Sequence, residues 1–268
     1  MKKLKFVFTI LFSTLFAVFV TTACNSASTP DAATDPAASP AAETLVMATS
    51  ADYPPYEFID TSSGSEEIVG FDIDIANYIT SELGYGLEIT NMDFNGLIPA
   101  LQAGRADFVM AGMTPTEERK QNADFSIIYY DAKNTIVALA DSGLTTVESL
   151  NGKRVGVQLG SIQEGAAKEI EGAEVIPLNR INEIVQELKA GRIDAAIIED
   201  TVAKGYVDAN PDLAFTVIED EGPSGSAIAF PKGSELTTKF DAVLQEMIDS
   251  GTMEELVVKW FGDSTPAS

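Results

Sequence analysis

Two stretches of the chain follow the same plan. Residues 101–112, LQAGRADFVMAG, and residues 188–199, LKAGRIDAAIIE, each run from a helix-like end through Ala-Gly, Arg and Asp into an apolar segment. Gly104 and Gly191 suit the left-handed conformation that often ends a helix. A common connection from helix to strand, used twice, is enough to explain the repeat. Two copies 87 residues apart nevertheless predict two similar α/β lobes.

The rest of the chain alternates strand-like and helix-like segments. Helical spacing of three or four links Ile75, Ile79 and Leu83, then Leu97 and Leu101, then Ile184 and Leu188, and finally Phe240, Leu244, Met247 and Ile248. Strand-like runs occupy residues 45–49, 106–112, 134–140, 154–159, 194–199 and 226–230. This alternation predicts sheets covered by helices. Ligands of open α/β sheets bind beyond the carboxyl ends of strands, which here are Ala111-Gly112-Met113 and Ile198-Glu199-Asp200.

The N-terminal residues are predicted to be a targeting segment. A basic start precedes an apolar stretch at residues 6–20, which is shorter than the ~20 residues of a spanning helix, so residues 1–23 are predicted to be a signal peptide. Cys24, the only cysteine, is either a free thiol or the lipid-attachment residue of a bacterial lipobox. TTAC resembles a lipobox, although Thr21 replaces the usual leucine, and we favour lipid attachment. Residues 24–43 are small, polar and Pro-rich, which predicts a disordered tether.

Charge and composition exclude several classes of function. The chain has 17 Lys and Arg against 41 Asp and Glu, a net charge of −24. This argues against nucleic acid and anionic membrane surfaces as partners; simple solubility explains the acidity, and a cationic ligand is weakly favoured. No histidine is present, and the lone cysteine is assigned to the lipid, so imidazole and thiolate catalysis are excluded. We expect no cofactor and no metal.

The stretch GMTPTEER, residues 112–119, predicts a helix start at the end of a strand. Thr114 suits the N-cap, Pro115 the first helical position, and Glu117 completes a capping box. A helix N-terminus favours an anion. Arg119 in the first turn opposes the helix dipole, so it either pairs with Glu118 or Asp124 or faces a bound anion.

The same signature recurs at GSIQEG, residues 160–165. Ser161 and Glu164 form a second capping box after a strand, and this helix start would present the N–H groups of Ser161 and Ile162. Asp200 ends a buried-looking strand, so it either caps the helix that follows or receives a ligand ammonium. One arginine, two helix starts and an aspartate together describe a receptor for the head group of an α-amino acid.

From Thr44 to about Gly262 the chain resembles solute-binding protein family 3, the polar amino-acid-binding proteins of bacterial ABC importers. The matching segments are ADYPPYEF (51–58), GFDIDIA (70–76), MDFNGLIPAL (92–101), AGMTPTEERKQNADFS (111–126), VGVQLGSIQE (155–164), DAAIIED (194–200), AIAFPKGS (227–234) and KWFG (259–262). YYDAKNTIV and VQLGSIQEG look most similar to Gram-positive lipoproteins of arginine uptake. The resemblance implies a type II periplasmic-binding-protein-like fold with lobe 1 at 44–133 plus 223–263, lobe 2 at 134–222, and a tail at 264–268. Two chain crossings, near 130–134 and 221–226, would form a hinge.

The resemblance also implies a role for each site residue. Arg119 would bind the α-carboxylate together with N–H groups near Thr114 and Ile162. The α-ammonium would meet Asp200, the Thr114 hydroxyl and the carbonyl of Ala111 or Gly112. Tyr53 and Phe94, which would otherwise be ordinary core aromatics, match positions that sandwich the side chain. The expected ligand-binding set is Ser50, Tyr53, Phe94, Ala111, Gly112, Met113, Thr114, Arg119, Gln158, Ser161, Ile162, Gln163, Glu199 and Asp200.

The ligand is expected to be a polar, basic L-amino acid. Ser50, Gln158, Gln163 and Glu199 match the side-chain pocket of relatives. Glutamine-type relatives have an aspartate and a lysine at the first two positions, and both are absent here. Glu199 either points into solvent or pairs with a cationic side chain stacked on Tyr53 and Phe94, which favours arginine.

These inferences predict a non-enzymatic substrate-binding lipoprotein of an ABC importer. It would capture the amino acid by hinge closure and deliver it to the permease, as a monomer held by its lipid on the outer face of the cell membrane. The alternatives are another polar amino acid such as glutamine, a sensory or adhesive lipoprotein, and a dehydratase that uses Glu199 and Asp200 as acid and base.

Overall fold

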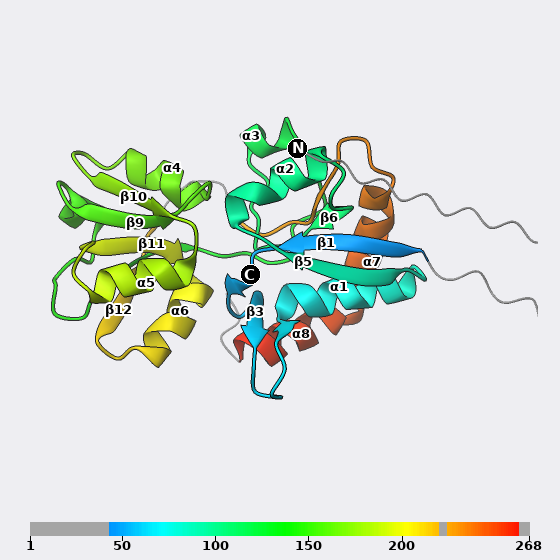
Figure 1. The fold of residues 1–268 in the computed structure, drawn as a ribbon, viewed down its shortest axis with the longest axis horizontal. Coiled ribbons are helices and arrows are strands. Elements are labelled where there is room, and N and C mark those ends of the chain that lie inside the picture. The colour runs from blue at the N-terminus through cyan, green and yellow to red at the C-terminus, as the bar shows by residue number, and fades with distance from the viewer. Residues whose placement is uncertain (1–42, 220–223, 263–268) are drawn as a thin grey trace, which may run out of the picture. The chain divides into compact units, whose positions relative to one another are not determined.

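A computed structural model describes residues 43–219 and 224–262 and contains two five-stranded sheets (Figure 1). We call the part built on the first sheet lobe 1 and the part built on the second sheet lobe 2. The predicted signal peptide, the lipid-attachment residue Cys24, the tether up to residue 42, and the tail beyond residue 262 lie outside the described residues.

Lobe 1 contains a mixed sheet with strand order β5-β1-β6-β13-β7. β1 pairs in parallel with β5 and β6, whereas β13 is antiparallel to β6 and β7. The strands are β1 (Thr44–Thr49), β5 (Gly86–Asn91), β6 (Phe108–Val109), β7 (Asp124–Phe125) and β13 (Ala229–Phe230). The helices are α1 (Phe71–Glu82), α2 (Leu97–Gln102), α3 (Glu117–Lys120), α7 (Leu236–Ser250) and α8 (Thr252–Phe261), and a short 3₁₀ turn, Phe94–Gly96, precedes α2.

A small antiparallel sheet, β2-β3-β4, completes lobe 1. Its strands are β2 (Asp52–Tyr53), β3 (Glu57–Asp60) and β4 (Glu67–Val69). Gly70 joins this sheet to α1 with φ 143°, and a Cβ atom there would lie 2.1 Å from the carbonyl oxygen of Tyr56. Only glycine therefore allows the start of α1 to approach β3 this closely.

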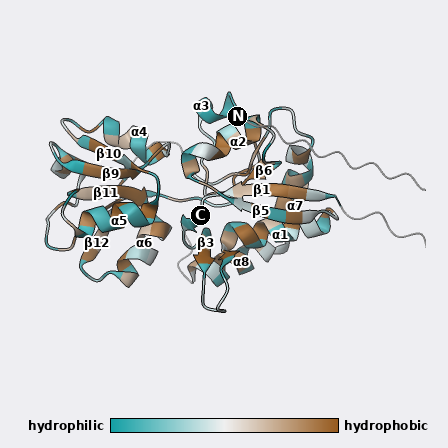
Figure 2. Ribbon diagram, viewed as in Figure 1, coloured by the Kyte–Doolittle hydropathy of each residue, from teal (hydrophilic) through white to brown (hydrophobic). Residues whose placement is uncertain are grey.

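Lobe 2 contains the second sheet, with strand order β10-β9-β11-β8-β12. The strands are β8 (Asn134–Leu139), β9 (Arg154–Gln158), β10 (Glu174–Leu178), β11 (Ala195–Glu199) and β12 (Leu213–Val217). The helices are α4 (Ile162–Lys168), α5 (Ile181–Lys189) and α6 (Asp200–Ala209), with a 3₁₀ turn at Val147–Leu150. β11 is buried along its whole length, and Figure 2 shows β9 and β11 as largely hydrophobic. The central strands of this sheet are thus covered on both faces.

Two chain crossings connect the lobes and run beside each other. Tyr130 and Ser226 form an antiparallel bridge, in which the Ser226 N–H donates to the Tyr130 carbonyl at 2.8 Å. The Tyr129 N–H donates to the Ser226 carbonyl at 2.9 Å. After the second crossing the chain adds β13 to the first sheet. The predicted architecture of two α/β lobes joined by a two-crossing hinge is confirmed.

The repeated segments build the same connection in each lobe. Gly104 and Gly191 have φ values of 65° and 66°. The carboxylate of Asp107 accepts the Val46 N–H at 2.7 Å, and that of Asp194 accepts the Arg154 N–H at 2.8 Å. Each aspartate therefore aligns the strand that follows the glycine with its parallel neighbour, β1 in lobe 1 and β9 in lobe 2.

Replacing either of these glycines by alanine is expected to lower the free energy of unfolding by about 1–2 kcal/mol, because L-residues disfavour positive φ. A Cβ atom at Gly104 or Gly191 would have no other atom within 4 Å, so the loss would come from the backbone conformation alone. Gly165→Ala is the matched control, since Gly165 lies inside α4, also with open space, and alanine there should stabilise by about 0.5–1 kcal/mol. Chemical unfolding measures all three; equal effects at the three positions would contradict this explanation.

Some elements differ from those expected. The runs at 106–112 and 226–230 form strands only at Phe108–Val109 and Ala229–Phe230, because the residues after β6 and those before β13 build the wall of the site. The apolar pattern also failed to predict β5, β10 and β12, because their half-exposed residues do not form a continuous apolar run. It failed as well to predict the short strands β2, β3, β4 and β7.

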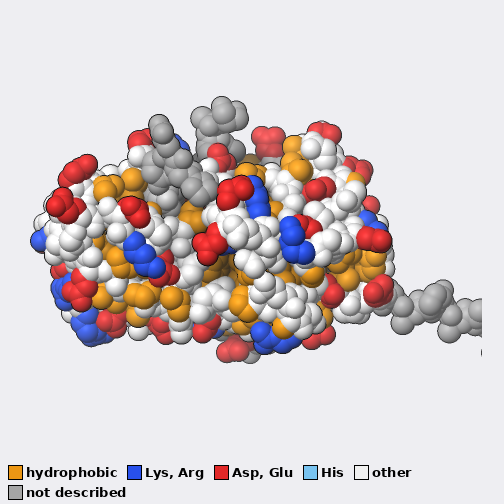
Figure 3. All heavy atoms as spheres, turned by 90° about the horizontal axis from the view of Figure 1, so that it is seen from above, with side chains coloured by type: hydrophobic (Ala, Val, Ile, Leu, Met, Phe, Trp, Pro, Cys, Tyr) orange, Lys and Arg blue, Asp and Glu red, His pale blue; other side chains and the backbone are white. Residues whose placement is uncertain are grey.

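The surface agrees with the composition. Figure 3 shows acidic side chains scattered over the face drawn, with Lys and Arg side chains among them and no basic patch. Among the helices of the described segments, none has both the length and the apolar character required to cross a bilayer.

Candidate functional site

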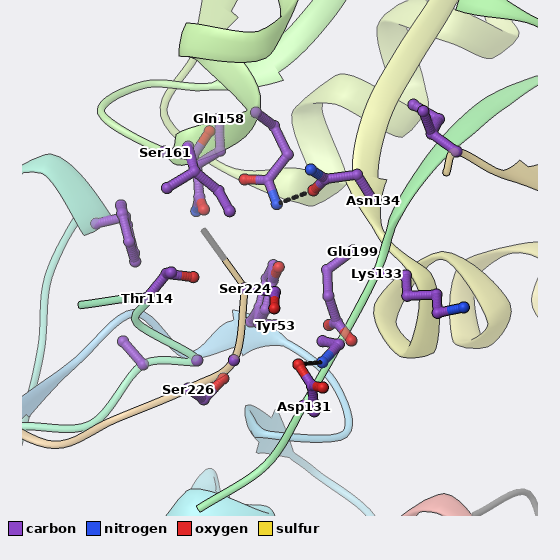
Figure 4. A pocket seen from close by; sticks show the side chains of 18 of the residues that line it. Tyr53, Thr114, Asp131, Lys133, Asn134, Gln158, Ser161, Glu199, Ser224 and Ser226 are labelled. Atoms are coloured by element: carbon purple, nitrogen blue, oxygen red, sulfur yellow. Dashed lines mark hydrogen bonds between the residues drawn. The ribbon is translucent and has the colours of Figure 1, made fainter. Parts of the chain in front are cut away.

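A cavity of about 160 Å³ lies where the two lobes meet the hinge (Figure 4). Its walls come from the ends of β6, β9 and β11 and from the starts of α3 and α4. Eleven of the fourteen predicted site residues line it: Tyr53, Phe94, Ala111, Gly112, Thr114, Arg119, Gln158, Ser161, Ile162, Gln163 and Glu199. The cavity therefore forms beyond strand ends of both sheets.

Three predicted residues lie elsewhere. Ser50 is buried, and its hydroxyl donates to the Asp52 carboxylate at 2.9 Å. Met113 is buried in the core of lobe 1 and borders a second, larger cavity, which shares Phe94 and Arg119 with the first. Asp200 is the first residue of α6 and is not among the residues that line the 160 Å³ cavity.

The start of α3 corrects the expected capping pattern. Thr116, not Thr114, is the N-cap, and its hydroxyl accepts the Arg119 N–H at 3.2 Å. Glu117 does not close a capping box; it pairs with Lys120 at 2.9 Å. Thr114 and Pro115 therefore precede the helix, and Thr114 is buried in the cavity wall with its carbonyl accepting from the Arg119 guanidinium.

Arg119 has no carboxylate within 4.0 Å among the described residues. The alternative partner Asp124 instead pairs with Lys232 at 2.6 Å. The guanidinium donates to two carbonyl oxygens, that of Thr114 at 2.8 Å and that of Gly160 at 2.9 Å. Since arginine carries five N–H donors, three remain for another acceptor.

The surroundings of Arg119 make this cation costly to leave unpaired. Its guanidinium carbon lies 5.2 Å from the centre of the Phe94 ring. Burial lowers the pKa of Arg119 from its ordinary value to about 10, so the side chain is still cationic at neutral pH. A partly desolvated cation without a carboxylate, beside a cavity, favours binding of an anion.

The start of α4 largely follows the prediction. Ser161 is the N-cap, and its hydroxyl accepts the Glu164 N–H at 3.2 Å. The Glu164 carboxylate accepts the Gly160 N–H at 2.7 Å rather than that of Ser161. Gly160 needs to be glycine, since φ is 80° and a Cβ there would lie 3.2 Å from that of Asn95 in lobe 1. Arg119 and the turn before α4 thus meet across the two lobes.

Gly112 gives the cavity wall its shape in lobe 1. Its φ is 55°, and a Cβ atom would lie 3.0 Å from the Tyr53 ring. Tyr53 and Phe94 are each only 9% exposed and both line the cavity. The two aromatic side chains therefore line the cavity and at the same time belong to the core.

Glu199 is the buried carboxyl group of the cavity. It is the N-cap of α6, and one carboxylate oxygen accepts from the N–H and the hydroxyl of Thr201, at 3.2 and 2.6 Å. The Tyr56 hydroxyl donates to the same oxygen at 3.4 Å. The other oxygen has no hydrogen-bond partner among the described residues. Burial raises the pKa of Glu199 well above its ordinary range, against the hydrogen bond from Thr201.

The Asp200 carboxylate contacts main-chain groups of the protein rather than the cavity. Its carboxylate accepts the main-chain N–H groups of Lys133 at 3.2 Å and Thr201 at 3.0 Å. The bond to Lys133 ties the start of α6 to the first hinge crossing. Helix capping was one of the two roles open to Asp200 from the sequence; the cap itself is Glu199, and Asp200 supports it from the next position.

The part of the cavity wall that lobe 2 provides is polar. Gln163 donates from its side-chain amide to Asn134 at 2.9 Å, the contact drawn as a dashed line in Figure 4. Gln158 is 4% exposed, and its amide nitrogen has no acceptor among the described residues. A buried donor without a partner beside a cavity is expected to meet a ligand acceptor.

The hinge supplies the cavity residues that motif reasoning missed. They are Asp131, Ala132, Lys133, Asn134, Ile218, Glu219, Ser224, Gly225 and Ser226. All lie on the two chain crossings, whose approximate positions were predicted. A signal was therefore present: segments that connect two lobes around a cleft also form its floor.

Several contacts already join the lobes beside the cavity. The Asp52 carboxylate accepts the Ile181 N–H at the start of α5 at 2.6 Å, and Arg180 lies 2.9 Å from Asp93 and 3.8 Å from Asp52. The Tyr206 hydroxyl donates to the Asp52 carbonyl at 3.0 Å. Asp52 thus caps a helix of the opposite lobe. Across residues 43–219 and 224–262, no cluster of three or more His, Cys, Asp or Glu side chains is arranged to hold a metal ion.

Comparison with known proteins agrees with this geometry. Residues 45–263 match the model of the bacterial extracellular solute-binding proteins, family 3. The arginine-binding extracellular protein ArtP of Bacillus subtilis is 50% identical over 222 residues, which cover 81% of this chain and 86% of ArtP. The crystal structure of a substrate-binding protein of an amino-acid ABC transporter matches with TM-score 0.80 and 47% identity, covering 81% of this chain and 99% of that one.

An ancestral arginine-binding protein bound to arginine matches with TM-score 0.77 and 42% identity, over 83% of this chain and all of that one. The matched region contains both lobes and every residue of the cavity. This chain therefore belongs to family 3 of the bacterial extracellular solute-binding proteins.

Proposed function

We propose that the protein binds L-arginine between its lobes and delivers it to the permease of an amino-acid ABC importer. The observation that carries this proposal is the pairing of two buried groups at one cavity. Arg119 has three free N–H donors and no carboxylate partner among the described residues, and Glu199 has a carboxylate oxygen without a donor. An α-amino acid provides the missing anion and cation.

The α-carboxylate is assigned to Arg119, helped by the N–H groups at the start of α4, which have no intrahelical acceptor. The α-ammonium is assigned to Glu199, with the Thr114 hydroxyl and the main-chain carbonyls of Ala111 or Gly112 as further acceptors. This assignment moves the ammonium contact from Asp200 to its neighbour, because Glu199 lines the cavity and Asp200 does not.

Arginine is preferred over other amino acids for two reasons. Tyr53 and Phe94 offer aromatic faces on which a planar guanidinium stacks. The hinge side of the cavity adds Asp131 and Glu219, of which only Glu219 has a cationic partner within 4.0 Å among the described residues, Lys133 at 3.8 Å. The similarity to arginine-binding relatives supports the same ligand. Glutamine is the second candidate, because Gln158 and Gln163 present amides to the cavity.

The family to which the chain belongs consists of extracellular proteins. We propose further that Cys24 carries a lipid, that residues 24–43 are its tether, and that the protein is a monomer. The arrangement would keep the binding lobes within reach of the permease while the ligand is captured. Because both lobes contribute to the cavity, ligand binding would favour the closed form over the open one.

Calorimetric titration with each common L-amino acid tests the ligand. L-arginine is expected to bind with a dissociation constant of about 1 μM or below, equivalent to about 8 kcal/mol. Lysine and glutamine should bind more weakly, and D-arginine should not bind, because its ammonium would face away from Glu199. A tighter constant for glutamine than for arginine would contradict the ligand assignment. Product formation from prephenate or arogenate would instead support the dehydratase alternative.

A further inference from the structure

A pair of carboxyl groups lies behind the wall of the site. Glu57 on β3 and Asp72 in the first turn of α1 are both completely buried. The main chain brings the two residues together, because the Asp72 N–H donates to the carbonyl of Tyr56, the neighbour of Glu57, at 2.9 Å. Neither residue lines the cavity, and neither has a role in the ligand contacts proposed above.

Asp72 connects two parts of the cavity wall. Its carboxylate accepts the Gly112 N–H at 3.0 Å and the Tyr129 hydroxyl at 2.8 and 2.9 Å. Tyr129 in turn donates its N–H to the Ser226 carbonyl at 2.9 Å. Since Gly112 and Ser226 both line the cavity, one buried carboxylate links the loop after β6 to the second hinge crossing.

Glu57 differs from Asp72 in having no N–H or O–H donor among the described residues at either oxygen. A fully buried carboxylate without a donor is costly to leave ionised, so a proton is expected on Glu57. Asp72 has two other donors and sits at a helix N-terminus, both of which favour its ionised form. The proton therefore belongs on Glu57.

The described groups that act most strongly on Glu57 include no positive charge to replace that proton. The groups acting most strongly on Glu57 are Asp72, Asp52 on β2 and Glu199 at the end of β11. Those facing Asp72 are Glu57, the Gly112 N–H and the Tyr129 hydroxyl. Burial raises the pKa of Asp72 to about 6, and burial together with these carboxylates raises that of Glu57 well above its ordinary range.

We propose that Glu57 and Asp72 form a proton-sharing pair that positions Gly112 and the hinge crossing for ligand binding. They act as positioning residues: the protonated Glu57 donates to Asp72, which keeps Asp72 ionised and oriented toward Gly112 and Tyr129. The effect on ligand affinity rests on the proposed function, whereas the shared proton does not.

The shared proton makes stability depend on pH in a defined direction. An unfolded glutamate loses its proton near pH 4.5, whereas the folded Glu57 retains it to higher pH. Folding thus takes up one proton in the interval between these two pKa values, and stability falls as pH rises through it. One linked proton changes the unfolding constant tenfold per pH unit.

Urea unfolding of the full chain between pH 5.5 and 8 measures this proton. The chain has no histidine, and the other carboxyl groups with a raised pKa, Asp72 and Glu199, are present in every variant compared, so the difference between proteins reports Glu57. Glu57→Gln keeps a donor toward Asp72 but cannot ionise, and Glu67→Gln on exposed β4 is the matched control. As pH rises, the unfolding constants of the wild type and of the control are expected to increase more steeply than that of Glu57→Gln. The difference should approach tenfold per pH unit, which corresponds to one additional proton released on unfolding. Parallel pH curves for all three proteins would overturn the shared proton.

Two further measurements test the positioning role. Asp72→Ala removes the acceptor of the Gly112 N–H and should lower the affinity for L-arginine at least tenfold, whereas Glu57→Gln should change it less than about threefold at pH 7. Amide exchange of Gly112 should be faster in Asp72→Ala than in the wild type, whether or not arginine is the ligand. Unchanged Gly112 exchange in a folded Asp72→Ala protein would overturn the positioning role. Failure of the wild type to bind arginine would contradict the proposed function alone.

Discussion

Replacing Arg119 by alanine is expected to reduce the affinity for L-arginine by about a hundredfold to ten-thousandfold while the protein remains folded. Two charge-assisted hydrogen bonds to the α-carboxylate contribute about 1.5–3 kcal/mol each. Because about 1.4 kcal/mol changes a dissociation constant tenfold, their loss amounts to two to four orders of magnitude. Arg119 lies in a one-turn helix, and among the described residues it has no carboxylate partner within 4.0 Å, so the core is not affected.

Calorimetric titration of Arg119→Ala measures this effect, and two variants serve as controls. Arg119→Lys retains the charge but loses the paired donors, so it should recover only part of the affinity. Arg105→Ala removes an exposed arginine of lobe 1 and should leave the affinity unchanged. A folded Arg119→Ala protein whose dissociation constant lies within about threefold of the wild type's would contradict the carboxylate assignment.

Replacing Glu199 by glutamine is expected to weaken binding of L-arginine by about 30-fold to several thousandfold. Removing one member of a buried, hydrogen-bonded charge pair typically costs about 2–5 kcal/mol. Glutamine still accepts from Thr201, so the N-cap of α6 is retained. Asp200→Asn is the matched control, because its oxygen can still accept from Lys133 and Thr201, and it should weaken binding less than about threefold.

The comparison between ligands identifies the contact. Glu199→Gln should weaken α-amino acids far more than their deaminated analogues, which have no ammonium. Equal losses for both ligand types would mean that Glu199 does not contact the ammonium. A larger effect for Asp200→Asn would assign the contact to Asp200.

The same variant should change the pH dependence of binding. Burial raises the pKa of Glu199 in the free protein, and a bound ammonium favours the ionised form. Binding is therefore expected to release protons and to strengthen as pH rises toward the raised pKa. This pH dependence should be smaller in Glu199→Gln.

The fold was largely predictable because its main signals are local. The apolar spacing of Ile75 and Ile79 identified α1, and the duplicated Ala-Gly-Arg-x-Asp segment predicted the same connection in both sheets. Strands with half-exposed faces, such as β10 and β12, carry no comparable pattern. Short strands such as β2 depend on contacts with distant residues, which local sequence does not encode.

The sequence identified most of the site residues but not how they are arranged in space. The acid at the end of β11 illustrates the difference: adjacent Glu199 and Asp200 look equivalent in sequence, but strand register buries the first and directs the second to the hinge. Likewise, Thr114 and Thr116 both suit an N-cap. The choice of Thr116 follows from the point where the chain leaves β6, a tertiary feature.

The contribution of the hinge needed the structure. Residues such as Asp131 and Ser226 carry no binding motif, and they reach the cavity only because the two crossings pass beneath it. The Glu57–Asp72 pair was also hidden in the sequence, since its members are separated by a turn, a strand and the glycine at position 70.

A crystal structure of the protein grown with L-arginine tests the central claim most directly. The account predicts one arginine between the lobes, with its α-carboxylate on the Arg119 guanidinium and its α-ammonium within hydrogen-bonding distance of Glu199. An arginine bound in the reverse orientation, or outside this cavity, would contradict it.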